Sequence, residues 1–340
     1  MRLLLLSLAV ALFLGLTTGT AAEPKPLRVG IIGLDTSHVT AFTGVLNGDK
    51  AKPALAGVRV VAAFPGGSED VEASRTRVKG FTDTLREKHG VEIVGSIDAL
   101  LSKVDVILLE SVDGRPHLEQ LKPVFKAGKP VFIDKPVAGS LADAIQIYDL
   151  AKAAKVPVFS SSSLRYSPDL VALKKNDKLG TVVGCLTYGP CSLEPHHPDL
   201  FWYGVHGVEV LYTIMGTGCE SVSRVQTKDT EVVTGVWKDG RVATFRGIRS
   251  GKSDYGAVIF GSKTIEAQKL AGGYEPLLVE IVKFFRGGPP PVSAEETVEM
   301  FAFMEAADES KRNGGAPVKI ADVIAKAREE IARKKTSTRN

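Results

Sequence analysis

Cysteine is scarce in this sequence, with three residues among 340. Three thiols cannot build a disulfide framework or a four-thiolate zinc site. Cys185 and Cys191 are six residues apart in a segment expected to be extended, where their Cα atoms would lie about 20 Å apart, against about 4.4–6.8 Å in a disulfide. A sharp turn at residues 189–190 would bring them together, and Cys219 has no evident partner. We therefore expect buried free thiols.

An excess of charge of one sign is also lacking. Lys and Arg total 43 and Asp and Glu total 39, which gives a net charge of +4. No basic face is concentrated enough to predict nucleic-acid binding, and a solvated helix end explains the one basic run, residues 333–339. With 44% hydrophobic and 24% charged residues, the composition is that of a globular chain long enough for two domains.

Only one hydrophobic run is long. Residues 3–16 are apolar, Arg2 precedes them and small residues follow to position 22. This pattern predicts a secretory signal peptide over residues 1–22, because the run is shorter than the roughly 20 residues that span a bilayer as an anchor. The sequence therefore predicts an exported protein, periplasmic or secreted, with no stable membrane insertion after cleavage.

The chain between residues 23 and 163 alternates short apolar strands with helical patterns. The strand candidates are nearly continuous in apolar residues, which is typical of strands buried on both faces of a parallel sheet; they are 28–33, 58–64, 106–110, 130–133 and 156–159. Ser140-Leu-Ala-Asp143 starts one of the intervening helices. This alternation predicts a doubly wound α/β domain.

Residues 164–333 show a different pattern of strand and helix candidates, and residues 334–340 form a basic tail. Tight turns separate several strand candidates, which predicts an open antiparallel sheet; the strands are 181–188, 231–237, 241–246, 257–260 and 264–268. Helices are expected before and after this sheet, at 204–215, 275–285, 294–312 and 320–333.

The first strand leads into a helix through Gly33-Leu-Asp-Thr-Ser-His38. A dinucleotide-binding loop would have glycines at three of these positions, but Asp35 stands at the second and His38 at the third. Asp35, Thr36 and Ser37 are equally explained as a helix cap. The second strand ends in Gly66, Gly67 and Ser68 instead of a ribose-binding acidic residue. These three residues either bind a ribose or form an ordinary turn.

Asp134, Lys135 and Pro136 follow a predicted parallel strand, where doubly wound domains bind their ligands. A lysine at such an edge donates hydrogen bonds to hydroxyl groups, and the proline fixes the backbone. A surface lysine beside a turn is the alternative.

This segment, with residues 137–144 after it, resembles the E-K-P segment of the Gfo/Idh/MocA oxidoreductase family. The resemblance continues over the whole mature chain, at residues 29–33, 106–117, 165–168, 206–209, 306–311 and 314–318. It implies a Rossmann-like N-terminal domain that binds NAD or NADP. It also implies a C-terminal domain with an open antiparallel sheet that carries the substrate face and the contact of a homo-oligomer, with helices packing back on the first domain.

The resemblance assigns catalysis to Lys135 and His206, which handle the proton of the substrate hydroxyl group. Many members have an aspartate four residues before this histidine, where Trp202 stands here, and Glu209 or Asp199 are candidates to replace it. His117 maps near the nicotinamide, or alternatively starts a helix. Further substrate-binding candidates are Arg165 and Tyr166.

Residues 194–203 form an aromatic and polar stretch just before His206. Aromatic faces and polar groups together suit a sugar-binding wall, and a buried aromatic cluster is the alternative; the residues are His196, His197, Asp199, Trp202 and Tyr203. A metal site built from this stretch with His206 and Glu209 matches no known spacing, so the sequence predicts no metal.

Two functions follow. The first is an exported NAD(P)-dependent oxidoreductase acting on a sugar, sugar acid or cyclitol, with a variant in which transient hydride transfer helps to cleave a glycosidic bond. The second is a carbohydrate-binding or scaffold protein that keeps the fold without redox activity, which the incomplete glycine loop and Trp202 favour.

Overall fold

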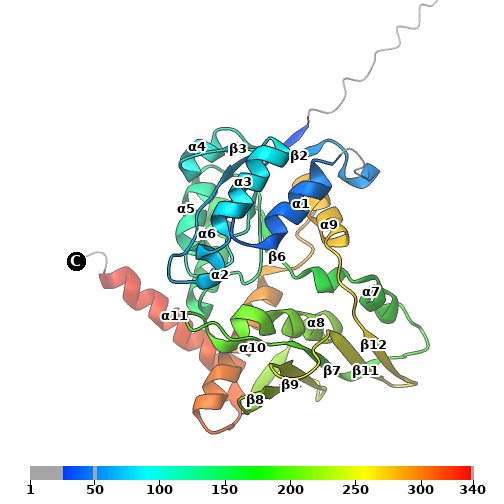
Figure 1. Ribbon diagram of the computed structural model, residues 1–340. Helices are drawn as coiled ribbons and strands as arrows, with labels where there is room; N and C mark the ends of the chain where they lie inside the picture. The colour runs from blue at the N-terminus through cyan, green and yellow to red at the C-terminus, as the bar shows by residue number, and fades with distance from the viewer. Residues whose placement is uncertain (1–25, 49–51, 338–340) are drawn as a thin grey trace, which may run out of the picture.

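The computed structural model describes residues 26–48 and 52–337. The predicted signal peptide lies outside the described residues. Two sheets, one from each half of the chain, lie one above the other with helices between and around them (Figure 1). None of the helices in the described ranges is long and apolar enough to cross a membrane.

The first half forms a six-stranded parallel sheet with the strand order β3-β2-β1-β4-β5-β6. Its strands are β1 (Leu27–Ile32), β2 (Val58–Phe64), β3 (Glu92–Ile93), β4 (Val106–Leu109), β5 (Val131–Ile133) and β6 (Val158–Ser160). The connecting helices are α1 (Ser37–Leu46), η1 (Pro53–Leu55), α2 (Glu72–Arg75), α3 (Val78–His89), α4 (Ile97–Leu101), α5 (His117–Lys126) and α6 (Leu141–Ala154). This is the predicted doubly wound domain, and its strand order reverses between β1 and β4, where such domains bind ligands.

The second half forms a seven-stranded sheet with the order β12-β11-β7-β10-β9-β8-β13. The strands are β7 (Val182–Pro190), β8 (Cys219–Gln226), β9 (Thr230–Trp237), β10 (Val242–Ile248), β11 (Gly256–Gly261), β12 (Ile265–Lys269) and β13 (Val318–Lys319). The sheet is mostly antiparallel as predicted, but β7 and β10 pair in parallel. After β7 the chain leaves the sheet and enters it again at β8. The strands β8, β9 and β10 then follow one another in antiparallel order, which places β10 next to β7 and in the same direction.

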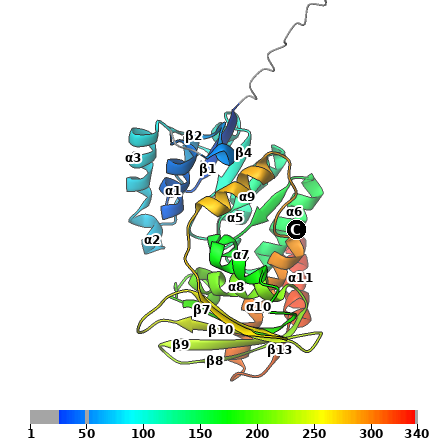
Figure 2. The same cartoon turned by 90° about the vertical axis from the view of Figure 1, so that its right-hand side faces the viewer.

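Helices of the second half cover one face of this sheet and reach back to the first (Figures 1 and 2). They are η2 (Ser163–Tyr166), α7 (Pro168–Lys174), the π-helical turn η3 (Leu200–Gly204), α8 (Val205–Met215), α9 (Glu275–Phe285), α10 (Ala294–Arg312) and α11 (Ile320–Ser337). Leu277, Leu278 and Ile281 of α9 share a core with Val29 and Ile31 of β1, so this helix packs on the N-terminal sheet. Helix α11 continues four residues beyond its predicted end.

All three cysteines are buried and unpaired, as predicted. Burial raises the pKa of the Cys185 thiol to about 12, so this thiol stays protonated and unreactive at neutral pH.

Candidate active site

A cleft of about 450 Å³ opens where the carboxyl ends of the N-terminal strands face helix α8. The N-terminal half contributes Thr36, Ser37, His38, Ala73, Arg77, Val112 and Lys135 to its lining. The second half contributes Ser163, Leu164, Trp202, Tyr203, His206, Tyr255, Gly272, Gly273 and Tyr274. The cleft therefore spans the strand-order reversal between β1 and β4 and continues to the end of β5.

His206 lies in the first turn of α8 and lines this cleft. Gly207 lets the helix approach the sheet, since a Cβ there would lie 2.1 Å from the ring of Phe245. Nδ1 of His206 lies 2.7 Å from the Oγ atom of Ser162, which leaves Nε2 available to a bound molecule. Burial and the nearby Lys135 charge lower the pKa of His206 well below its usual value, so the ring is neutral at pH 7.

Lys135 follows β5 and lines the same cleft. Its backbone N–H donates to the Oδ1 atom of Asp134 at 2.8 Å, and its Nζ atom lies 5.4 Å from the centre of the Tyr203 ring. An ammonium group over an aromatic face is attracted by the ring. The two residues predicted to be catalytic thus come from different halves of the chain and line one cleft.

Glu209 and Arg165 lie behind His206 and do not line the cleft. Glu209 accepts hydrogen bonds from the Ser161 hydroxyl at 2.6 Å, the Ser162 N–H at 2.7 Å and Arg165 Nε at 2.8 Å. Glu209 therefore does not replace the missing aspartate by touching the His206 ring; it holds the loop that carries Ser162. Tyr166, the other substrate-binding candidate from this region, also does not line the cleft.

Thr36, Ser37 and His38 line the cleft at the start of α1. Thr36 is the N-cap residue and accepts from the His38 N–H. Asp35 is fully buried, and its carboxylate accepts from the Ser74 hydroxyl at 2.6 Å and the Val112 N–H at 2.8 Å. The cap predicted for this loop is therefore made by Thr36, whereas Asp35 ties the loop to the segments after β2 and β4.

The remaining residues predicted to bind the cofactor do not line the cleft. Gly33 packs against Ser111, where a Cβ would lie 2.3 Å from Oγ. The Ser68 hydroxyl donates to Asp113 at 2.7 Å, and the preceding Gly66 and Gly67 have positive φ angles. These three residues therefore form an ordinary turn, the second of the two interpretations that the sequence allowed. His117 is the first residue of α5, and its two ring nitrogens lie 3.0 and 2.9 Å from the carbonyl oxygens of Val137 and Ser111. Pro136 and Asp134 lie beside Lys135 without lining the cleft.

Only Trp202 and Tyr203 of the predicted sugar-binding wall line the cleft. Nε2 of His197 lies 3.1 Å from Asp113 and accepts from the Gly114 N–H. Trp202 packs against His197 at 5.0 Å between ring centres and against Val71 and Val112. Residues 194–203 therefore pack against the loops that follow β2 and β4. His196 pairs with Glu194, and Asp199 pairs with Arg224 and Lys311.

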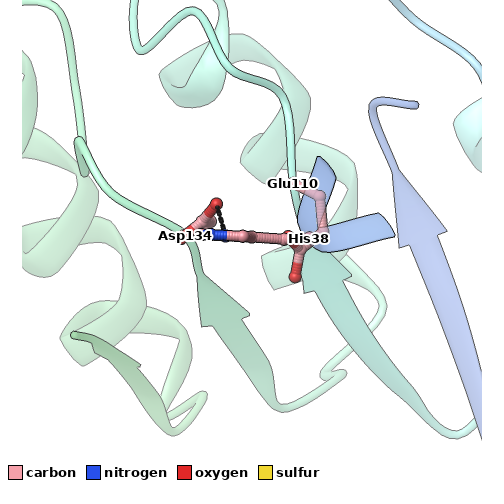
Figure 3. Close-up of side chains that lie close together, drawn as sticks. All are labelled: His38, Glu110 and Asp134. Atoms are coloured by element: carbon pink, nitrogen blue, oxygen red, sulfur yellow. Dashed lines mark hydrogen bonds and ion pairs between the residues drawn. The ribbon is translucent and has the colours of Figure 1, made fainter. Parts of the chain in front are cut away.

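A buried cluster that the sequence did not predict lies under the cleft. His38, Glu110 and Asp134 come from α1 and from the ends of β4 and β5, and Nδ1 of His38 lies 2.6 Å from Oδ2 of Asp134 (Figure 3). Neither carboxylate oxygen of Glu110 has a hydrogen-bond partner among the described residues. Burial and the Asp134 charge raise the pKa of Glu110 well above its usual range. The sequence feature that could have predicted this cluster is Glu110, a charged residue directly after the apolar run of β4.

Comparison with known proteins agrees with this architecture. Residues 27–162 match a model of the oxidoreductase family Gfo/Idh/MocA, NAD-binding Rossmann fold. An inositol 2-dehydrogenase of Saccharopolyspora erythraea is 29% identical over 131 residues, 37% of this chain and 33% of that protein. The chain spans less than half the length of each curated relative that it matches.

Solved structures resemble nearly the whole chain. The fold of scyllo-inositol dehydrogenase from Lactobacillus casei, solved with NAD(H) and scyllo-inositol, has a TM-score of 0.71 at 14% identity and covers 87% of this chain and 100% of that one. GenD2 from gentamicin A biosynthesis, solved with NAD, has a TM-score of 0.70 at 17% identity, covering 87% and 97%. Residues 27–162 therefore match the NAD-binding domain of the Gfo/Idh/MocA oxidoreductase family, and the solved structures share the fold of nearly the whole chain.

Proposed function

We propose that this protein is an NAD(P)-dependent oxidoreductase that acts on a hydroxyl group of a cyclitol or sugar. The observation that carries the proposal is that Lys135 and His206, each from a different half of the chain, line one cleft. The inositol dehydrogenases among the similar proteins support the substrate class.

The start of α1 fits the phosphate groups of a dinucleotide. Thr36 and Ser37 line the cleft there, where backbone N–H groups and the helix dipole favour anions. The exposed Arg77 lines the same cleft and supplies a positive charge. The charge of Asp35 is bound by Ser74 and the Val112 N–H instead of lying at the helix end. Thr36, Ser37 and Arg77 would therefore hold the phosphates of NAD or NADP.

The residues of the chain account for the movement of the proton. A nicotinamide cofactor held by Thr36, Ser37 and Arg77 would supply the acceptor for the hydride that leaves the substrate carbon. His206 is neutral because its pKa is lowered, so its Nε2 atom takes the hydroxyl proton when Nδ1–H donates to Ser162. The ammonium group of Lys135 donates hydrogen bonds to the same oxygen and stabilises its developing negative charge. The carbon that loses the hydride becomes a carbonyl carbon.

The cleft lining suits a ring with several hydroxyl groups. Tyr203, Tyr255 and Tyr274 combine aromatic faces with hydroxyl groups, and Ser163 adds another. A cleft of about 450 Å³ lies within the range of about 300–1,000 Å³ that is usual for small-molecule sites. These residues, with Trp202, replace His196, His197 and Asp199 as our candidates for substrate contact.

We further propose a homo-oligomer formed through the C-terminal sheet and, from residues 1–22, export of the protein. The sheet face opposite α8 and α10 is uncovered by any described element (Figure 2). Its strands carry exposed apolar side chains, namely Val183, Val225, Val236, Val242, Phe260 and Ile265. Exposed apolar side chains on an uncovered sheet favour association.

The experiment is a thermal-shift titration with NAD⁺, NADH, NADP⁺ and NADPH, followed by turnover assays with inositols and pyranose sugars. A cofactor at 100 times its dissociation constant stabilises the protein by about 2.7 kcal/mol. We expect a shift with one cofactor pair and reduction of that cofactor by a cyclitol or sugar. Bound cofactor that remains through turnover without net reduction would favour glycosidic cleavage instead. Sugar binding with no cofactor binding would overturn the proposal in favour of the non-redox binding protein.

A further inference from the structure

The cluster of His38, Glu110 and Asp134 joins three metal-binding side chains from distant parts of the sequence. One donor atom from each residue lies within 4.8 Å of the others, and all three residues are buried (Figure 3). Helix α1 supplies the imidazole, and the two carboxylates follow the neighbouring strands β4 and β5. Because neighbouring parallel strands end at the same edge, the fold itself brings these donors together.

Glu110 provides an independent indication that the cluster binds a ligand. Its side chain has no exposed surface, and neither of its oxygens has a hydrogen-bond partner in the described part of the chain. A buried polar group without a partner costs free energy, and a buried carboxylate requires a compensating cation or a proton. Its Oε2 atom lies 4.0 Å from Nδ1 of His38, which in turn contacts Asp134. The unpartnered carboxyl group is therefore directed into the cluster.

We propose that His38, Glu110 and Asp134 bind one divalent transition-metal ion of the zinc or manganese kind. One imidazole and two carboxylates favour such ions over Mg²⁺ and Ca²⁺, which prefer oxygen ligands alone. Around a tetrahedral ion at about 2.0–2.2 Å, donor atoms are about 3.3 Å apart. The distance from His38 Nδ1 to Asp134 would widen from 2.6 Å and that to Glu110 would shorten from 4.0 Å, so these two distances change by less than 1 Å, and the two carboxylate donors already lie within 4.8 Å of each other.

The surroundings of the cluster hold the ligands in position. The Lys135 N–H binds Oδ1 of Asp134 and leaves Oδ2 for the ion. The ring of His38 stacks on Phe42 at 5.3 Å and meets the edge of Tyr274 at 4.6 Å. Contacts of this kind orient ligands around protein-bound metals.

Three protein ligands leave a coordination position open, as in catalytic metal sites. His38 lines the cleft beside Lys135, so the ion would lie directly under the place where a substrate binds. The chemical class of ligand for the open position is an oxygen donor, such as a hydroxyl group of a polyol. This inference does not depend on the proposed redox activity, since the ion can be measured without turnover.

The test is the metal content of the full chain purified without chelator, measured by elemental mass spectrometry. We expect about one equivalent of a transition metal per chain, since the cluster supplies the three protein ligands of one catalytic-type site. Glu110→Gln and Asp134→Asn should lower the metal affinity by about tenfold or more. Glu92→Gln, an exposed change at the first residue of β3 in the same sheet, is the matched control and should retain the ion.

Wild-type protein provides a second measurement in case the variants fail to fold. After chelator treatment, Co²⁺ should bind with one-to-one stoichiometry, produce visible absorption bands and raise the melting temperature, and Zn²⁺ should displace it. Protein that lacks a metal as purified and shows no response to Co²⁺, Zn²⁺ or Mn²⁺ would overturn the proposal and indicate a protonated Glu110. Metal that persists in a folded Glu110→Gln variant would also overturn it, because the ion would then lie elsewhere.

Discussion

The Oγ atom of Ser162 lies 2.7 Å from Nδ1 of His206. The backbone N–H of Ser162 in turn donates a hydrogen bond to the Glu209 carboxylate at 2.7 Å, which holds Ser162 in place. This chain of contacts orients an imidazole that has no carboxylate of its own. Trp202 stands where the family resemblance predicts that carboxylate, and the serine occupies the orienting role. A hydroxyl partner leaves the imidazole less basic than a carboxylate would.

Ser162→Ala should therefore reduce turnover while the protein stays folded. The change removes the contact that orients His206 but leaves the cleft lining intact. We expect kcat to fall by about 10-fold to 100-fold, with little change in KM, which is less than the roughly 10²–10⁴-fold that general acid–base catalysis contributes, because the base itself stays in place. Steady-state kinetics separates these constants. An unchanged kcat would show that Ser162 does not position the base.

Lys135→Ala and His206→Ala should each abolish detectable turnover without unfolding the protein. In the proposed mechanism Lys135 stabilises negative charge on the substrate oxygen and His206 takes its proton, so both losses should raise the reaction barrier. Both side chains line the cleft, and Ser162, the buried partner of His206, still accepts a hydrogen bond from the Leu164 N–H when the imidazole is removed. Lys126→Ala, an exposed change at the end of α5, is the control. Circular dichroism checks folding, and wild-type rates in either cleft variant would remove that residue from the mechanism.

Arg77→Glu should weaken dinucleotide binding. Arg77 lines the cleft beside the start of α1, and reversing its charge places a carboxylate near the phosphates. We expect the dissociation constant to rise by about tenfold, or about 1.4 kcal/mol, with a smaller effect at high salt because exposed charges are screened. Arg75→Glu, which is exposed and outside the cleft lining, should bind normally. If Arg75→Glu and Arg77→Glu weakened cofactor binding equally, the effect would come from the overall charge of the protein and not from a contact between Arg77 and the phosphates.

The layout of the fold was largely predictable, because strands buried on both faces leave continuous apolar runs. Strand β3 was missed since it has two residues and Glu92 is exposed. Strand β8 was missed because its pattern mixes Glu220, Ser221 and Arg224 with apolar residues. Arg224 is buried by pairing with Asp199, Glu231 and Asp308, a compensation that no local pattern reveals.

The candidate site was predictable only in part. Motifs in the sequence point to Lys135 and His206, which line the cleft, whereas Tyr255, Tyr274 and Arg77 carry no motif and reach the cleft through tertiary packing. Glu209 and His197, which the sequence offered as substrate contacts, do not line the cleft, since polar side chains near a motif serve structure as readily as binding. Here Glu209 holds Ser162, and His197 holds the loop of Asp113.

Asp113→Asn should destabilise the protein, most strongly at neutral pH. Asp113 is buried and accepts from Arg115 at 2.7 Å and Ser68 at 2.7 Å, next to His197. These donors hold the pKa of Asp113 far below its usual value despite its burial. Hydrogen bonds to a charged group contribute about 1.5–3 kcal/mol, so we expect a loss of about 2 kcal/mol at pH 7 in chemical denaturation.

The pH dependence follows from the direction of this shift. A carboxyl group with a lowered pKa in the folded state contributes its full stability above its unfolded pKa of about 3.9 and loses it as the pH falls further. The reason is that the unfolded chain takes up the proton first. Wild-type stability should thus fall more steeply below about pH 5 than that of Asp113→Asn, and the two curves should converge. Asp98→Asn, an exposed change at the start of α4, should follow the wild type; parallel curves for Asp113→Asn would show that the carboxylate is not held in this network.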